Sequence, residues 1–382
     1  MAIMKIFKKF TLWVLLASAT LTVMTGSIIA PVLNLLRDGL GVDPASVGLI
    51  ITTHALFMAL FSPLIGNLID RVGARKLFVS GLVLYGLAGG SGLFITSYWV
   101  LIVSRAILGI AVAAIATTIA VTILNLYKGV ERNKIMGWRG SANSFGGIIW
   151  PLIGGFLGGF SWHLPFAVYF LGIPLGFFAL ITMPETRKEK NQNTGSVLKV
   201  FRIKPVLFVI YGLLFLTMTL LYTIVVFLPQ LLETMGISSP FYISLFLAVT
   251  ALSAGLTSLM YGKIKSRLSY KMIVLIALSL WTVGFTAISQ ASSSVIIAAS
   301  VALFGVGQGM VIPAIMVWAG ETVATSFRGR IISYLIAFGF IGQFSSTIIF
   351  GPVSLSFGLN GVFLMAGVIC ALLLVISVAI RK

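Results

Sequence analysis

Charged residues are scarce in this chain, and acidic residues are the scarcest. Aspartate and glutamate together number eight among 382 residues, charged residues of both signs make up 9%, and apolar residues make up 59%. The mean hydropathy is +1.12. A soluble chain of this length cannot cover so much apolar surface with so few charges. The composition therefore excludes an ordinary soluble protein and predicts a membrane protein.

Cysteine and histidine are also nearly missing. The one cysteine, Cys370, excludes a disulfide framework and a cysteine-based metal cluster. His54 and His163 are too few and too far apart in sequence for a metal site. No phosphate-binding loop of the form G-x-x-x-x-G-K-[ST] is present, so ATP is not expected as the energy source. We therefore expect no metal and no bound cofactor. We also expect that the protein is not an enzyme, because neither paired acids nor a nucleophile beside a cavity is evident.

Apolar runs of helix length fill the chain in two sets of six. A transmembrane helix needs about 20 apolar residues. The first set lies near 11–36, 45–67, 75–95, 98–126, 134–159 and 163–183, and the second near 205–232, 240–262, 270–289, 294–320, 329–350 and 359–380. A polar, basic stretch separates the two sets. The sequence therefore predicts a bundle at 1–185, a cytoplasmic linker at 186–204 and a second bundle at 205–382.

Lysine and arginine number 26 and give a formal net charge of +18. If the N-terminus is cytoplasmic, all of them except Arg37, Arg105 and Arg139 fall in segments that face the cytoplasm. Such a bias sets the orientation of a multi-pass protein. We expect both termini in the cytoplasm and the chain in the cell (plasma) membrane. Because topology explains the basicity, nucleic acid is not expected as a partner.

A short charged stretch, 66–76, joins the second and third apolar runs and reads GNLIDRVGARK. Taken as a lone charge cluster, it is equally typical of a solvated basic loop. As a whole it resembles the loop signature of the major facilitator superfamily, roughly G-x-L-x-D-R-x-G-R-[RK], shifted only at Ala74. The matching residues are Gly66, Asp70, Arg71, Gly73 and Arg75. The resemblance implies 12 transmembrane helices in two pseudo-symmetric six-helix bundles, with Asp70 pairing at the inner face of the first bundle.

The same loop recurs about 196 residues later, as Gly262 to Lys271. The glycine, the arginine and the final cation are kept, while Ser266 replaces Asp70. Arg132 and Arg328 correspond in the same way. Two bundles related by duplication are typical of secondary transporters that hold substrate between the halves near the membrane midplane.

Arg105 lies inside the fourth apolar run, where a charge is costly unless it faces a polar cavity or a partner. It is followed by Gly109 and resembles the fourth-helix motif R-x-x-x-G, which implies a role in proton coupling. Asp38 and His54 are the expected partners. The alternative is an arginine that snorkels to the outer interface.

The fifth run resembles the antiporter signature G-x-x-x-G-P-x-x-G-G, with Gly146, Pro151, Gly154 and Gly155 in place. Physically this is a seam of small residues that lets helices pack closely. Trp150 stands where the signature has glycine. We expect its indole to block the closest helix approach, which weakens the antiporter assignment and leaves the fold unaffected.

No carboxylate is expected at mid-membrane, so the predicted cavity is either positive or neutral. The candidate lining residues are Asn34, His54, Arg105, Arg139, Tyr222, Gln230, Trp318 and Gln343. In the positive picture both arginines face the cavity. In the neutral picture Arg139, about one turn inside the fifth helix, snorkels beside Lys134, and Asp38 neutralises Arg105. Both pictures disfavour quaternary cations.

The sequence thus predicts a secondary transporter that acts on a small molecule in the lipid bilayer. The resemblance favours a monomeric drug:proton antiporter that exports an amphipathic, neutral or anionic compound by alternating access, driven by a proton gradient. A symporter or uniporter that imports a small metabolite is the alternative. An integral-membrane enzyme or a channel is a third class, but a channel would need a pore loop or a charge ring.

Overall fold

The computed structural model describes residues 2–185 and 201–379, and these residues contain helices and no strand. Contacts divide the chain into two compact units, one made of Met1–Val42 with Leu49–Gln192 and the other of Asp43–Gly48 with Asn193–Lys382. The segment Asp43–Gly48 thus packs on the second unit, although it precedes most of the first in sequence. Most of the predicted linker, 186–200, lies outside the described residues.

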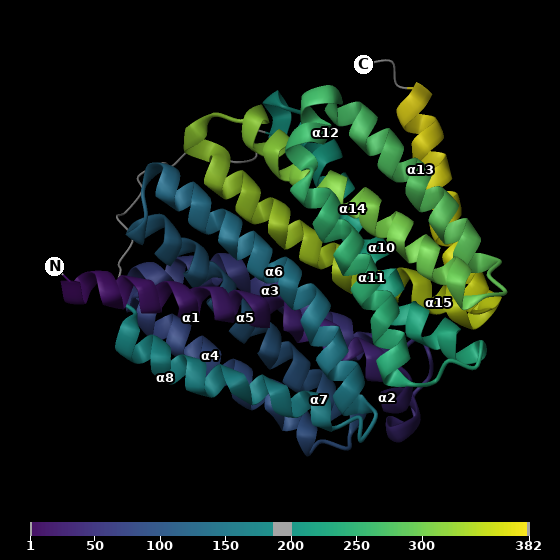
Figure 1. The fold of residues 1–382 in the computed structure, drawn as a ribbon, viewed down its shortest axis with the longest axis horizontal. Coiled ribbons are helices and arrows are strands. Elements are labelled where there is room, and N and C mark those ends of the chain that lie inside the picture. The colour runs from purple at the N-terminus through teal and green to yellow at the C-terminus, as the bar shows by residue number, and fades with distance from the viewer. Residues whose placement is uncertain (1, 186–200, 380–382) are drawn as a thin grey trace. The chain divides into compact units, whose positions relative to one another are not determined.

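The helices of the first unit form six spans, and Figure 1 labels their main helices. The first is α1, Ala2–Ser27, continued by η1, Ala30–Val32, and α2, Leu33–Leu40. The next four are α3, Gly48–Val72; α4, Ala74–Gly90; α5, Tyr98–Leu126; and α6, Gly129–Gly158. The short η2, Ser91–Leu93, follows α4. The sixth is α7, Leu164–Ala167, with η3, Val168–Leu171, and α8, Gly172–Thr182.

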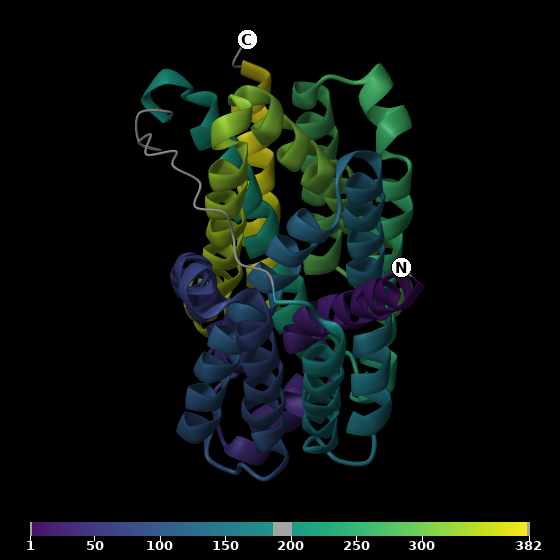
Figure 2. The same cartoon turned by 90° about the vertical axis from the view of Figure 1, so that its left-hand side faces the viewer.

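The second unit repeats this arrangement, and its spans pack against one another in both views (Figures 1 and 2). Its elements are α10, Val206–Thr234; α11, Pro240–Leu259; α12, Tyr261–Arg267; α13, Tyr270–Ser289; α14, Ser294–Thr322; and α15, Thr325–Ala379. Within α15, Gly358 has a φ of +70°, which an L side chain rarely adopts, so α15 is two spans joined at this glycine. The short α12 connects α11 to α13.

By length and apolar composition alone, ten helical segments could cross a membrane in the described residues. The last of these contains both halves of α15. The polar first half of α6 keeps that helix out of the ten. With these two corrections the count agrees with the predicted 12 helices, and the all-α membrane fold is confirmed.

Equivalent contacts in the two units show the internal repeat directly. A Cβ on Gly109 of α5 would overlap the carbonyl oxygen of His54 on α3, and a Cβ on Gly305 of α14 would overlap that of Thr250 on α11. Each pair member is 196 residues from its counterpart. Close helix crossings of this kind require a glycine because any side chain would separate the backbones.

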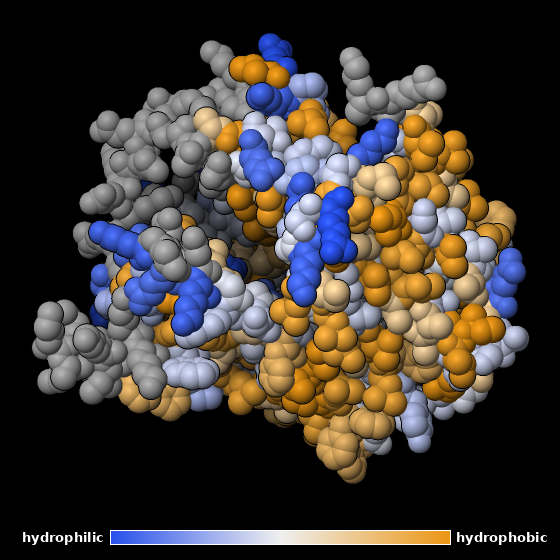
Figure 3. All heavy atoms as spheres, turned by 45° about the horizontal axis from the view of Figure 1, so that its top comes forward, coloured by the Kyte–Doolittle hydropathy of each residue, from blue (hydrophilic) through white to orange (hydrophobic). Residues whose placement is uncertain are grey.

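The outward faces of the helices are apolar. Figure 3 shows broad areas of apolar side chains, with hydrophilic residues gathered in smaller groups. The exposed large apolar side chains include Trp99, Phe177, Leu259 and Phe357. An exposed apolar surface of this extent is stable only in contact with lipid.

Candidate functional site

Arg105 lies seven residues into α5, as predicted, and its side chain is fully buried. Its Nη2 donates to the carbonyl oxygens of Ala88 at 3.2 Å and Gly89 at 3.0 Å. These carbonyls are at the C-terminal end of α4, where the helix dipole is negative. Its Nε and Nη2 each lie 3.3 Å from Oγ of Ser104. The guanidinium is therefore held by helix carbonyls and a hydroxyl rather than by a carboxylate.

Two aromatic rings complete the surroundings of Arg105. Its Cζ lies 5.1 Å from the ring centroid of Phe166 and 5.2 Å from that of Tyr169. The hydroxyl of Tyr169 donates to the carbonyl oxygen of Thr25 at 2.6 Å. The arginine is thus surrounded by α4, α5, α7 and η3, and Tyr169 connects it to α1. Its Nη1 is buried and has no hydrogen-bond partner, so one donor remains open to another group.

The two expected partners of Arg105 differ in position. The side chain of Asp38 is 60% exposed and pairs with Arg37 at 2.8 Å. The prediction that Asp38 neutralises Arg105 is therefore wrong, because the neighbouring Arg37 binds that carboxylate first. His54 is buried, and Nδ1 of its ring has no hydrogen-bond partner. Its backbone packs on Gly109, one turn after Arg105.

The second unit builds the same region without a charge. Val301 and Phe285 occupy the positions that correspond to Arg105 and Gly89. Phe285 packs on Phe304 at 5.5 Å and on Phe363 at 6.3 Å between ring centroids. The fold is therefore compatible with an apolar cluster at this place. The costly buried arginine of the first unit is not required for helix packing.

The loop between α3 and α4 is tied to the end of the first unit. Gly73 has a φ of +97°, and a Cβ on it would overlap the carboxylate of Glu185. Oε1 of Glu185 accepts from the backbone N–H of Arg75 at 3.2 Å, and its Oε2 lies 3.6 Å from Nε of Arg75. Sequence reasoning missed this partner, although Glu185 is one of only eight acidic residues. An acidic residue at the N-terminus of α4 is also favoured by the helix dipole.

The structure gives fewer contacts for the other predicted residues of this loop. Gly66 has open space around its Cα, and Arg71 is exposed. Asp70 lies in the last turn of α3, but its side chain, like those of Arg132 and Arg328, is outside what the structure describes. The pairing of Asp70 stays a prediction.

The seam of small residues on α6 packs against α1. A Cβ on Gly146 would lie 3.2 Å from the carbonyl oxygen of Thr20, and one on Gly154 would overlap that of Ile28. Between them, Nε1 of Trp150 donates to the carbonyl oxygen of Thr20 at 3.0 Å. The expectation that Trp150 blocks the closest approach is wrong, because its indole bonds to α1 and the two helices still meet closely at Gly154. Pro151 and Gly155 are buried on the same helix.

The polar cavity candidates of the second unit lie on α10 and α15. Gln230 on α10 is buried and donates through Nε2 to the carbonyl oxygens of Pro44 at 3.2 Å and Val226 at 3.0 Å. Gln343 on α15 is buried, with Nε2 3.7 Å from Sδ of Met218 on α10. Tyr222 on α10 is half-buried. Gln230 therefore holds the Asp43–Gly48 segment in place.

Trp318 does not line a cavity with these residues. Its ring stacks on Tyr270 at 5.1 Å between centroids, and Nζ of Lys265 lies 4.1 Å from the centroid of Tyr270. The hydroxyl of Tyr270 donates to Glu321 at 2.6 Å. Trp318 thus belongs to a cluster at the start of α13 and the end of α14.

In the first unit, Asn34 is buried and Arg139 is half-buried. Arg139 lies ten residues into α6, about three turns rather than one, because that helix begins at Gly129 instead of 134. Lys134 is exposed, with its Nζ 5.1 Å from the ring centroid of Trp138. The structure therefore brings Arg105, Gly109 and His54 together in this unit and leaves Arg139 on another helix.

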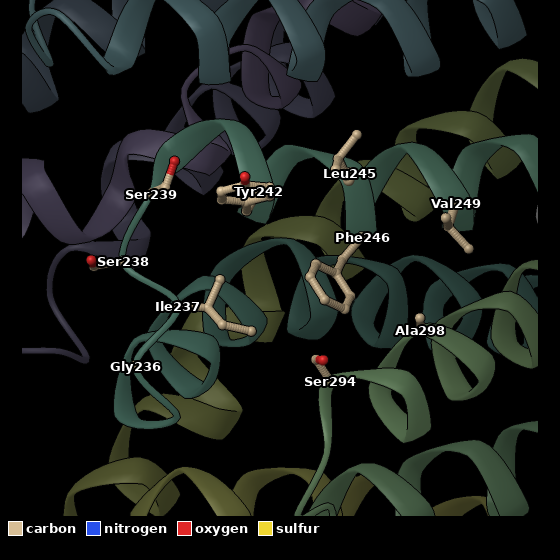
Figure 4. Close-up of a pocket in the computed structure, with 10 residues that line it drawn as sticks. All are labelled: Gly236, Ile237, Ser238, Ser239, Tyr242, Leu245, Phe246, Val249, Ser294 and Ala298. Atoms are coloured by element: carbon tan, nitrogen blue, oxygen red, sulfur yellow. The ribbon is translucent and has the colours of Figure 1, made fainter.

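A cavity of about 510 Å³ opens at one end of α11 and α14 (Figure 4). Ile237, Leu245, Phe246, Val249 and Ala298 make it mostly apolar, and the hydroxyls of three serines lie at its rim. None of the predicted cavity residues lines it.

Known proteins resemble the chain along its length. The Major Facilitator Superfamily matches residues 15–269 and 214–382. The chain is 26% identical over 347 residues to the bacillibactin exporter of Bacillus subtilis (strain 168), covering 86% of both proteins. It is 28% identical over 198 residues to the class B tetracycline resistance protein of Escherichia coli, covering 48% of this chain and 49% of that one.

Among solved structures, the nucleoside transporter NupG matches with a TM-score of 0.82 at 16% identity, covering 98% of this chain and 100% of NupG. At this identity the match shows the fold alone. The family match over most of the chain decides the general class. The chain belongs to the Major Facilitator Superfamily and is a multi-pass membrane transporter of small molecules, not an enzyme.

Proposed function

We propose that this protein is a proton-coupled exporter of an amphipathic, neutral or anionic organic compound in the plasma membrane. It works by alternating access as a monomer, with both termini in the cytoplasm. The similarity to a bacillibactin exporter over most of the chain supports export. The similarity of about half the chain to a tetracycline resistance protein supports a drug-like substrate.

The proposal that the substrate is neutral or anionic rests on the positions of the carboxylates. In the described residues each acidic residue lies in a loop or within a turn of a helix end, as Asp38, Glu131, Glu233 and Glu321 show. Asp43, in the loop before α3, is bonded to Ser46, and these hydrogen bonds together with the amide of Ala45 lower the pKa of its carboxyl. No carboxylate of the described spans is therefore placed to attract a cation at mid-membrane.

Transport by purified protein in proteoliposomes tests the coupling. We expect accumulation of a substrate from a panel that includes bacillibactin, tetracycline, an organic anion and a neutral lipophile, and only when a pH gradient is imposed. An ionophore that dissipates the gradient should reduce accumulation to the level of protein-free vesicles. Equal uptake with and without the gradient would identify a uniporter. Movement of substrate in the same direction as the protons, rather than in the opposite direction, would identify a symporter.

Ethidium provides a test of substrate charge. Cells that express the protein are expected to extrude ethidium no faster than vector controls, because a quaternary cation finds no acidic partner in the described spans. Arg139→Gln separates the positive cavity from the neutral one, since it should weaken export of an anion and leave a neutral compound unaffected. Ethidium efflux above the vector level would count against both the positive cavity and the neutral cavity.

A further inference from the structure

A groove of about 570 Å³ runs along the surface of the first unit between α4 and α8, which lie side by side in Figure 1. It is lined by Lys76, Val79, Ser80, Val83, Leu84 and Leu87 of α4 and by Leu180 of α8. Except for Lys76 and Ser80, these lining residues are apolar. None of them belongs to the Arg105 site or to the predicted substrate cavity.

Close packing of the two helices explains why the groove exists. A Cβ on Gly172 would lie 2.6 Å from the carbonyl oxygen of Leu82, and one on Gly86 would lie 2.6 Å from the side chain of Ile173. A Cβ on Gly176 would be within 3.5 Å of Leu82 as well. Because the backbones approach through glycines, the larger side chains on either side stand above the contact line.

Those larger side chains form the walls. Leu87 is 53% exposed and Leu180 is 50% exposed, so both lie on the open surface of the unit. The hydroxyl of Ser80 donates to the carbonyl oxygen of Leu77 at 3.2 Å. This bond satisfies the hydroxyl of Ser80, which lines the groove. Apart from Lys76 and Ser80, the groove is therefore apolar.

Lys76 places a positive charge at one end of the groove. Lys76 is exposed, and no ion pair joins it to any described residue. Glu185 is the nearby acid, but it binds the backbone and side chain of Arg75. Among the described residues, the groove thus has an ammonium that forms no ion pair at its end and mostly apolar walls along its length.

The length of the groove matches one membrane leaflet. From Lys76 to Leu87 the helix rises by about 16 Å, which is roughly half of the 30 Å hydrocarbon core. We propose that this groove binds an anionic phospholipid of the cytoplasmic leaflet. The phosphate pairs with Nζ of Lys76, and one acyl chain starts beside Val79 and Leu180 and runs along Val83 and Leu87. The choice of leaflet rests on the proposed orientation, and the site itself does not depend on the transported substrate.

Native mass spectrometry of the purified full chain tests this directly, with phosphatidylglycerol and phosphatidylcholine as probes. We expect the wild type to retain phosphatidylglycerol in preference to phosphatidylcholine. Lys76→Gln should reduce that preference about fivefold, the effect of one cation at a lipid surface. Val83→Trp fills the groove and should remove retention of both lipids. Leu180→Trp fills it from the exposed wall of α8, where a large side chain interferes least with folding.

Matched controls lie outside the groove. Lys263→Gln removes an exposed cation from another loop, and Val209→Trp adds an indole to an exposed position of α10. Both should retain lipid as the wild type does. Equal retention of the two lipids by the wild type, or no change in Lys76→Gln, would overturn the proposal. Unchanged phosphatidylglycerol retention in the folded groove-filling variants would overturn it too. Since the readout is lipid binding, a failed transport assay leaves this result intact.

Discussion

Arg105→Ala is expected to abolish gradient-driven accumulation of substrate, while folded protein stays in the membrane. The substitution removes a fully buried cation that is held by the carbonyl oxygens of Ala88 and Gly89. We expect the bundle to accept an uncharged side chain here, because the second unit has Val301 at the equivalent position and keeps the same close crossing at Gly305. We therefore expect accumulation to fall to the level of protein-free vesicles with little loss of folded protein.

Two further measurements decide whether Arg105 couples substrate transport to the proton gradient or only supports the structure. Downhill exchange of substrate without a gradient should persist in Arg105→Ala if the residue acts in coupling, and should vanish if the substitution damages the site. Arg105→Lys keeps the charge but not the planar fork that reaches two carbonyls, so partial coupling is expected. Val301→Ala is the matched control in the second unit and should transport normally. Accumulation at wild-type rates in Arg105→Ala would show that the arginine is structural.

The chemical basis for coupling lies in the surroundings of the guanidinium. Its Nη1 is a buried donor that no hydrogen bond satisfies. An open donor of this kind favours any nearby group that can supply an electron pair, because leaving it unpaired costs free energy. Asp38 is bound by Arg37 and cannot serve from its observed position. His54, whose Nδ1 is also buried without a partner, is the remaining candidate for the proton.

The fold follows from the sequence because its main determinant is local. Runs of about 20 apolar residues predict spans wherever they occur, and the cation bias and the loop at 66–76 add topology and family. These local patterns do not predict every break in a helix or every helix start. The sequence does not predict two features of these helices. The break between Ser27 and Ala30 lies inside an apolar run, and α6 begins at Gly129, in a polar segment before its apolar run.

The site was only partly predictable, because its contacts join distant parts of the chain. Arg105 stands out as an intramembrane charge, but Tyr169 and Phe166 resemble ordinary packing residues in the sequence. Glu185 is the last residue of the predicted first bundle, and its contact with Arg75 spans 110 residues. Trp150 was misjudged for another reason. Sequence gives the size of an indole but not its direction, and the direction decides whether it separates two helices or bonds them.

Gly154→Ala is expected to have the largest effect on stability. A Cβ at this position would overlap the backbone carbonyl oxygen of Ile28 on α1. No rotation of a side chain can relieve a contact with backbone, so α1 and α6 must move apart along the seam that also contains Gly146 and Trp150. Overpacking of a tight interface costs about 1–3 kcal/mol, and this clash belongs at the upper end. Thermal unfolding of the purified protein should show a clear drop in melting temperature, accompanied by loss of transport.

The same helix supplies the control. Gly140 lies on α6 with nothing within 4 Å of a Cβ placed on it. Gly140→Ala changes helix propensity in the same direction as Gly154→Ala, and an exposed glycine replaced by alanine favours the helix by about 0.5–1 kcal/mol. Its melting temperature should stay level or rise. The difference between the two variants therefore isolates the contact with Ile28 from the general effect of removing a glycine. If both variants melt like the wild type, α1 and α6 do not depend on this glycine for their close approach.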